Sequence, residues 1–166
     1  MARKFRGESV HKVDSKGRVS IPAPFRRVLE ENDPEWTEGL YPNLVIVYGD
    51  KNRQFLEGFT MTAMADVDSR IEALPRGSRN RRILERMFSG QAVSMQVDET
   101  GRLVLSPKLR EKINIKDEAV FVASGDTFQI WEPTAYAANE AKYEEWIEEF
   151  DADFDPLTLL DAEPEV

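Results

Sequence analysis

Residues 14–21 read Asp14-Ser15-Lys16-Gly17-Arg18-Val19-Ser20-Ile21, and the pattern returns later as Asp98-Glu99-Thr100-Gly101-Arg102-Leu103-Val104-Leu105. The two stretches are offset by 84 residues, and each has Asp, Gly and Arg at matching places. Internal similarity of this kind is sought first, because a repeat defines the architecture before single elements are assigned. The chain is therefore predicted to contain two copies of one small unit.

The similarity continues downstream of the motif. Phe25-Arg26 matches Leu109-Arg110 at the same offset, and the apolar residues 44–47 match residues 119–122 after one shift of register. The shift arises because the first copy carries a longer loop at residues 32–42, which contains proline and glycine. Each copy reads as strand, tight turn, strand, short helix, strand, turn and strand.

The repeated motif predicts a hairpin with a type I turn. An aspartate starts each turn and a glycine ends it in the left-handed conformation, which makes four residues the turn-organising candidates: Asp14, Gly17, Asp98 and Gly101. After the first turn, Val19 and Ile21 point to one face of the strand, whereas Arg18 points to the other. We therefore expect the arginine to leave the turn away from the core.

Helical spacing and capping residues predict the remaining elements. A short amphipathic helix starts at Pro24, and its counterpart follows Ser106-Pro107, where Ser106 suits an N-cap. Two helices are predicted at residues 60–75 and 78–89, and a last one from residue 133 to about residue 150. The last helix has aromatic and aliphatic side chains on one face: Tyr136, Tyr143, Ile147 and Phe150.

Together these elements predict an α+β fold that is mainly β. Two tandem halves pack as one pseudo-twofold core, because a single half of about 50 residues buries too little apolar surface to be stable alone. The predicted divisions are a first half at 1–59, a helical connector at 60–90, a second half with the C-terminal helix at 91–150, and an acidic, loosely ordered tail at 151–166.

Composition limits the chemistry. The chain has 166 residues, 41% of them apolar, which is enough for a compact core. It has no cysteine and one histidine, His11, so we expect no disulfide, no metal site and no cofactor. The first residues are basic without the apolar run of a signal peptide, and no stretch reaches the length of a membrane span. We expect a soluble, cytoplasmic protein with no membrane partner.

The net charge of −9 initially argues against nucleic acid, because phosphate binding needs a cationic face. The charges are uneven, however. Residues 1–30 hold eight Lys/Arg against three acidic residues, residues 70–86 hold six Arg against two Glu, and residues 132–166 hold twelve acidic residues against one Lys. The acidity therefore belongs mainly to the C-terminal part, which leaves a cationic working surface available elsewhere.

The ordered motifs resemble the MraZ family, whose tandem halves are swapped-hairpin β-barrel units of the AbrB/SpoVT type. The resemblance covers roughly residues 3–150. It rests on Phe5-Arg6-Gly7, on residues 14–18 followed by Ile21-Pro22, on Asp98-x-x-Gly101-Arg102, and on Gly125-x-x-Phe128-Gln129-Ile130-Trp131. One Asp-x-x-Gly-Arg turn is common, whereas two of them, each before an apolar strand and a proline-started helix, are specific.

The resemblance implies two AbrB-like halves and a transcriptional regulator of the division and cell-wall gene cluster. It implies binding to short repeated G-rich boxes of double-stranded DNA, ring-shaped homo-oligomers and a nucleoid-associated location. The sequence departs from a perfect repeat where Ser106-Pro107 replaces Pro22-Ala23. The family pattern does not require the acidic C-terminal extension.

An arginine displayed after a tight turn can reach a DNA groove, where bidentate donation to guanine is the commonest specific contact. Arg18 is therefore the first candidate for base reading, and Arg102 is its counterpart. Glu99 beside Arg102 would repel phosphate, so the first copy is expected to carry more of the contact. Phosphate contacts, which position the protein without reading sequence, are assigned to Arg3, Lys4, Arg6, Lys12 and Lys16.

Each candidate also has a simpler structural interpretation. Arg18 and Arg102 could each pair with the turn aspartate of the same copy within the barrel. The arginines of residues 70–86 are interpreted as a solvated helix face or a subunit contact rather than as a DNA contact. The tryptophans are assigned to packing, because none lies in a basic run: Trp36, Trp131 and Trp146.

Two other functional classes compete with DNA binding. An enzyme is not expected, because the chain has no nucleophile elbow, phosphate-cradling glycine loop or metal-ligand cluster. The alternative is an oligomeric scaffold or partner-regulating protein whose acidic tail recruits another protein without sequence-specific DNA binding. Removal of residues 151–166 discriminates between these, because it should abolish a scaffold's partner binding yet leave DNA binding intact or stronger.

Overall fold

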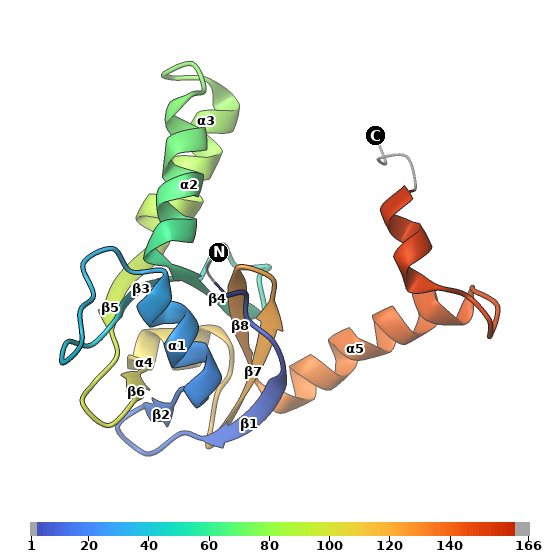
Figure 1. The fold of residues 1–166 in the computed structure, drawn as a ribbon, viewed down its shortest axis with the longest axis horizontal. Helices are drawn as coiled ribbons and strands as arrows, with labels where there is room; N and C mark the ends of the chain where they lie inside the picture. The colour runs from blue at the N-terminus through green and yellow to red at the C-terminus, as the bar shows by residue number, and fades with distance from the viewer. Residues whose placement is uncertain (1–2, 162–166) are drawn as a thin grey trace.

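The computed structural model describes residues 3–161, and its body is built on two antiparallel β-sheets (Figure 1). The larger sheet has six strands, in the spatial order β1 (Glu8–Lys12), β7 (Glu118–Ser124), β8 (Thr127–Trp131), β4 (Phe55–Thr60), β3 (Asn43–Val47) and β5 (Ala92–Gln96). The smaller sheet, called the β2–β6 ribbon below, pairs β2 (Arg18–Ser20) with β6 (Arg102–Val104).

The two sequence copies exchange their first strands. β1 of the first copy pairs with β7 of the second, and β5 of the second copy pairs with β3 of the first. The registers are equivalent, since Glu8 lies opposite Val122 and Ala92 lies opposite Val47. The predicted architecture of two AbrB-like halves in one pseudo-twofold core is therefore confirmed, with a swapped hairpin on each side.

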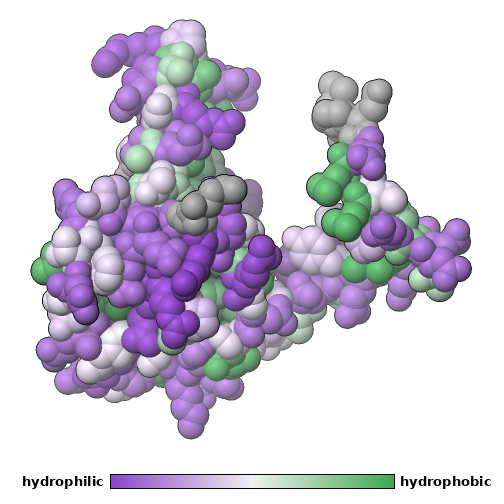
Figure 2. Space-filling view, viewed as in Figure 1, coloured by the Kyte–Doolittle hydropathy of each residue, from purple (hydrophilic) through white to green (hydrophobic). Residues whose placement is uncertain are grey.

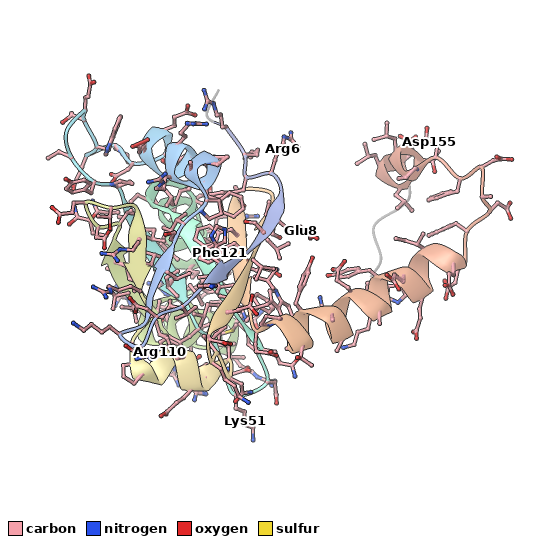
Figure 3. All side chains as sticks on the ribbon, turned by 90° about the horizontal axis from the view of Figure 1, so that it is seen from below. Arg6, Glu8, Lys51, Arg110, Phe121 and Asp155 are labelled. Carbon is pink, nitrogen blue, oxygen red and sulfur yellow. The ribbon has the colours of Figure 1, made fainter. Side chains whose placement is uncertain are left out.

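One apolar core runs through both halves. Phe25 from the first copy and Phe121 and Phe128 from the second belong to the same buried cluster, and Figure 3 shows Phe121 inside the body. Phe5 packs edge-on against Phe25 and Phe128, with ring centroids 5.2 Å apart in both pairs. Because these rings come from both copies, neither half alone could keep the contacts. Each fully buried side chain of this size stabilises the fold by about 1.5–3 kcal/mol.

Two short helices follow the ribbon strands. Helix α1 (Ala23–Glu31) begins one residue before the predicted Pro24, because Pro22 takes the N-cap position. Helix α4 (Pro107–Lys112) begins as predicted, and the Ser106 hydroxyl accepts a hydrogen bond from the Leu109 backbone N–H at 3.3 Å. Both helices contribute buried side chains to the common core.

A helical hairpin projects from the body between β4 and β5 (Figure 1). It consists of α2 (Met61–Glu72), α3 (Arg79–Glu85) and the π-helical turn η1 (Arg86–Gly90), in agreement with the two helices predicted there. Its base packs in a second apolar cluster that includes Phe59, Met64 and Phe88. The hairpin is therefore attached through its base, while its tip extends outward.

The C-terminal helix α5 (Pro133–Glu148) also extends away from the body (Figure 1). The chain then turns, and the ring of Phe154 stacks on that of Phe150 at 4.0 Å. A 3-10 helix, η2 (Pro156–Asp161), lies in the tail that was expected to be loosely ordered, whereas residues 162–166 of that tail lie outside the described residues. No helix within residues 3–161 combines the length and apolar character needed to span a bilayer.

Candidate nucleic-acid interface

The β2–β6 ribbon places the two turn arginines on one outer surface. Arg18 lies opposite Val104, and Arg102 lies opposite Ser20. Directly opposed residues share a face of an antiparallel pair, so Arg18 and Arg102 are diagonal neighbours on the same side. The alternating positions Val19 and Leu103 face the core, with 1% and 0% exposure.

The first turn holds its arginine through Asp14. One carboxylate oxygen of Asp14, Oδ1, accepts hydrogen bonds from the backbone N–H groups of Lys16 and Arg18 at 3.0 and 2.9 Å. The other oxygen, Oδ2, accepts from Nε of Arg18 at 2.6 Å. These donors, led by the Arg18 backbone N–H, lower the pKa of Asp14. One carboxylate therefore closes the turn and orients the guanidinium.

The second turn repeats this arrangement with Asp98. Its Oδ1 accepts from the backbone N–H groups of Thr100 and Arg102, both at 2.9 Å, and from the Thr100 hydroxyl. Its Oδ2 accepts from Nε of Arg102 at 3.3 Å. Partial burial alone would raise the pKa of Asp98, but the backbone and hydroxyl donors together outweigh it and lower that pKa.

The ion pairs leave both guanidinium groups open to solvent. The Arg18 side chain is 38% exposed and the Arg102 side chain is 32% exposed. Only Nε of each is engaged, and within residues 3–161 no group accepts a hydrogen bond from their terminal nitrogens. Each arginine therefore pairs with its turn aspartate through Nε and still presents its terminal N–H groups to solvent.

An open hollow of about 540 Å³ lies beside the ribbon on the Arg18 side. It is lined by three basic and three acidic side chains, together with Val13 and Ser20: Lys12, Arg18, Arg102, Asp14, Asp117 and Glu118. Lys16 lies exposed at the adjacent turn. In the described part of the chain, no group of three or more His, Asp or Glu side chains could hold a metal ion.

Each turn rests on the other copy. The Leu105 backbone N–H donates to the Gly17 carbonyl at 2.7 Å, and the Ile21 N–H donates to the Gly101 carbonyl at 3.0 Å. Arg110 reaches from α4 to the first turn, where its Nη1 donates to the Ser15 carbonyl at 3.5 Å. The two turns are therefore positioned against each other through the pseudo-twofold contact.

The sequence alone does not point to Arg110 and its repeat partner Arg26 as part of the site. Nε of Arg110 donates to the Leu105 carbonyl at 3.0 Å, and Arg26 lies so close to Gly101 that a Cβ there would meet its Nη1 at 1.9 Å. Both arginines thus support the turn of the opposite copy. Their matching positions in the repeat were the available signal, but the contact joins residues far apart in the chain.

The other predicted cations divide into two groups. Lys12 and Lys16 lie near the first turn. Arg3 lies instead at the far end of α1, where its Nε pairs with Glu31 at 3.1 Å, and Lys4 lines a hollow beside it. Figure 3 shows Arg6 pointing outward at the opposite side of the body from Arg110. The structure therefore does not bring Arg3, Lys4 and Arg6 to the turn.

The exchange of hairpins within one chain, with turn arginines side by side on an outer ribbon, defines the class: a tandem AbrB-like swapped-hairpin protein. A family model described as "MraZ protein, putative antitoxin-like" matches residues 4–72 and 87–155, which include both copies. The chain belongs to the MraZ family.

The similar proteins cover between 76% and 98% of the chain. It is 63% identical to the "Transcriptional regulator MraZ" of Ruegeria pomeroyi, with 98% of each chain covered. It is 47% identical to the protein of the same name from Cereibacter sphaeroides, which covers 97% of this chain and 98% of the relative. Identity with the Pelagibacter ubique protein of that name is 35%, over 76% of each chain.

Proposed function

We propose that this protein is a transcriptional regulator that binds double-stranded DNA through the β2–β6 ribbon. The observation that carries the proposal is the pair of partly exposed arginine side chains, Arg18 and Arg102, each held at Nε by its turn aspartate. The remaining N–H groups of Arg18 form the fork that matches O6 and N7 of guanine, a contact that contributes about 1–3 kcal/mol of discrimination. The name shared by the similar proteins supports the same function.

Arg18 is the principal base-reading residue in this proposal, and Arg102 is the secondary one. Lys12 and Lys16 contact phosphates on the same side and set the position of the ribbon on the duplex. The distant Arg3, Lys4 and Arg6 contribute to DNA binding only through neighbouring stretches of the duplex. The turn aspartates and glycines act indirectly, because they hold the two arginines in place.

The target in this proposal is a set of short repeated G-rich boxes upstream of the division and cell-wall gene cluster. A homo-oligomeric ring would place several ribbons along one DNA and convert weak single contacts into tight binding. The regulator acts in the cytoplasm at the nucleoid, and the proposal includes no enzymatic activity. A scaffold without DNA binding is the second candidate, favoured by the exposed apolar side chains of the C-terminal part.

The test compares the wild type with Arg18→Ala on repeated G-rich boxes and on a scrambled duplex, over a range of salt concentrations. We expect Arg18→Ala to lose about 10- to 100-fold of its preference for the boxes while its oligomeric state is unchanged. Arg27→Ala, which removes an exposed arginine of α1, serves as the matched control. Equal preference in Arg18→Ala and wild type would remove Arg18 from this role.

A further inference from the structure

The C-terminal arm, defined as residues 137–161, begins where α5 leaves the body. The first turn of α5 is well anchored. Glu132 caps it by accepting from the backbone N–H groups of Thr134 and Ala135, and the Tyr136 hydroxyl donates to Glu8 of β1. Beyond this turn the helix extends into solvent (Figure 1). Since the 16-residue helix is about 24 Å long, the arm reaches well past the edge of the sheet.

The arm exposes an apolar stripe. Its members follow i, i+3, i+4, i+7 spacing and are 40–65% exposed: Tyr143, Trp146, Ile147 and Phe150. Trp146 was expected to be a packing residue, but it is 58% exposed and its ring contacts only that of Tyr143 among the described aromatic side chains. In η2, Leu157 and Leu160 are 68% and 81% exposed, and Figure 2 shows hydrophobic patches on this segment.

An isolated helix of this length is only marginally stable in water, and a continuous apolar surface of this kind usually marks a contact with another protein. The arm is also strongly acidic. Nine carboxylates accompany one lysine between residues 137 and 161: Glu140, Glu144, Glu145, Glu148, Glu149, Asp151, Asp153, Asp155 and Asp161. A partner of the arm should therefore offer both cations and apolar surface.

The helical hairpin carries a matching surface. Arg79, Arg82, Ile83 and Arg86 repeat the i, i+3, i+4, i+7 spacing and form what is called here the α3 face. Ile83 is 47% exposed, and the three arginines are exposed. No carboxylate of residues 3–161 forms an ion pair with them, whereas Arg81 on the adjacent side of α3 pairs with Glu85. The α3 face is thus cationic, partly apolar and unneutralised.

We propose that the C-terminal arm of one copy docks on the α3 face of a second copy. The charges are opposite, the spacing of the two stripes is the same, and guanidinium groups stack well on the rings of Trp146 and Tyr143. Within one chain the arm and the hairpin extend from different parts of the body and lie apart (Figure 1). The inference rests on the homo-oligomer of the proposed function and names the contact that would build it.

DNA is the competing occupant of the α3 face, because phosphates also suit unpaired arginines. DNA would leave the apolar stripe of the arm uncovered, however, and the carboxylates around that stripe would repel phosphate. A second copy satisfies both surfaces at once. For this reason we favour the contact between copies over a DNA contact.

The test uses reversed charges in the full-length protein. One variant carries Arg79→Glu, Arg82→Glu and Arg86→Glu, and the other reverses the carboxylates that flank the apolar stripe of the arm: Glu140→Lys, Glu144→Lys and Glu149→Lys. Each variant alone brings like charges together at the contact, so we expect at least a tenfold higher protein concentration for half-assembly in sedimentation velocity at physiological salt. An equimolar mixture should assemble as the wild type does, because opposite charges then meet only between unlike chains.

The control variant reverses two exposed cations elsewhere, Arg27→Glu on α1 and Lys51→Glu in the β3–β4 turn, and should assemble normally. Circular dichroism and urea unfolding check that all variants fold. The proposal is overturned if either triple variant assembles like the wild type, or if the mixture fails to recover, as docking within one chain would predict. Weaker DNA binding with unchanged assembly would also overturn it and assign the α3 face to DNA.

Failure of this contact and failure of the proposed function are distinguishable. Binding to a duplex with one G-rich box reports on a single ribbon, and the effect of Arg18→Ala there does not depend on assembly. Disrupted assembly with an intact Arg18 effect supports both proposals. If the triple variants assemble normally and Arg18→Ala still weakens binding to this duplex, the docking contact is overturned and the proposed function stands.

Discussion

The first and second turns share their hydrogen bonds and differ in their surroundings. In both, an aspartate accepts from two backbone N–H groups and from the arginine Nε, but this last distance is 2.6 Å in the first turn and 3.3 Å in the second. Lys16 of the first turn is replaced by Thr100, whose hydroxyl also bonds to Asp98. The first turn therefore holds its arginine more closely and adds a cation beside it.

The surroundings of the second turn are acidic and aromatic. The long loop of the first copy brings Trp36, Glu38 and Tyr41 into a hollow next to Glu99. The equivalent connection beside the first turn is shorter, and the hollow on the Arg18 side is lined by Lys12 together with Asp117 and Glu118. The hydrogen bonds within a turn thus come from its own motif, whereas its electrostatic environment depends on a loop of the opposite copy.

The largest expected effect concerns stability. Gly17 and Gly101 both have positive φ, but an added Cβ would meet the backbone oxygen of Leu105 at 2.1 Å in the first turn and the flexible end of Arg26 in the second. We expect Gly17→Ala to lower the free energy of unfolding by about 3 kcal/mol and Gly101→Ala by about 1–2 kcal/mol in urea titrations.

Gly7→Ala is the control for this pair, because Gly7 also has positive φ but nothing lies within 4 Å of an added Cβ. It should show the cost of the backbone conformation alone, about 1 kcal/mol. Equal losses for Gly17→Ala and Gly101→Ala would mean that the contact with Leu105 relaxes as readily as a side chain does.

The next effect concerns base discrimination. Arg18→Ala should cost about 2 kcal/mol of preference for G-rich boxes, whereas Arg102→Ala should cost less than about 0.5 kcal/mol, because acidic side chains surround the second turn. Competition binding between boxed and scrambled duplexes measures both values. If the two variants lose the same preference, the ribbon reads DNA symmetrically and the loop around the second turn has no electrostatic role.

A smaller effect concerns the salt dependence of DNA binding. The affinity for DNA falls as salt rises, so the slope of log K against log salt is negative. Lys16→Thr should make this slope shallower by about 0.9 for each engaged copy, since one phosphate contact is lost. Thr100→Lys combined with Glu99→Ser gives the second turn the residues of the first and should make the slope steeper. An unchanged slope in Lys16→Thr would show that Lys16 does not contact phosphate.

The smallest effect is the pH dependence of stability. Hydrogen bonds lower the pKa of Asp14 and of Asp98 in the folded protein. Each ionised carboxylate therefore stabilises the fold above the ordinary aspartate pKa of about 3.9, and this stabilisation is lost as pH falls through the lower folded value. Acid titration of the urea midpoint should show less loss below pH 4 in Asp14→Asn and Asp98→Asn than in the wild type. Wild-type behaviour in either variant would exclude that turn from the acid response.

Much of the secondary structure could be predicted because its causes are local. The aspartate and glycine of each turn act over four residues, and Ser106 and Ser78 cap helices through groups three residues away. The repeat itself predicted the paired halves, because one half cannot bury its apolar face alone. These features depend on hydrogen bonds and spacing that are visible in a short window of sequence.

The placement of the candidate site residues was decided by contacts between segments far apart in the chain. The diagonal placement of Arg18 and Arg102 depends on the β2–β6 register, and the support of the first turn by Arg110 joins residues 95 positions apart. The same folding places Arg3 at the far end of α1 and leaves Trp146 in solvent, contrary to its assignment to packing. No local pattern could indicate these outcomes, because they follow from which surfaces meet when the two halves exchange their hairpins.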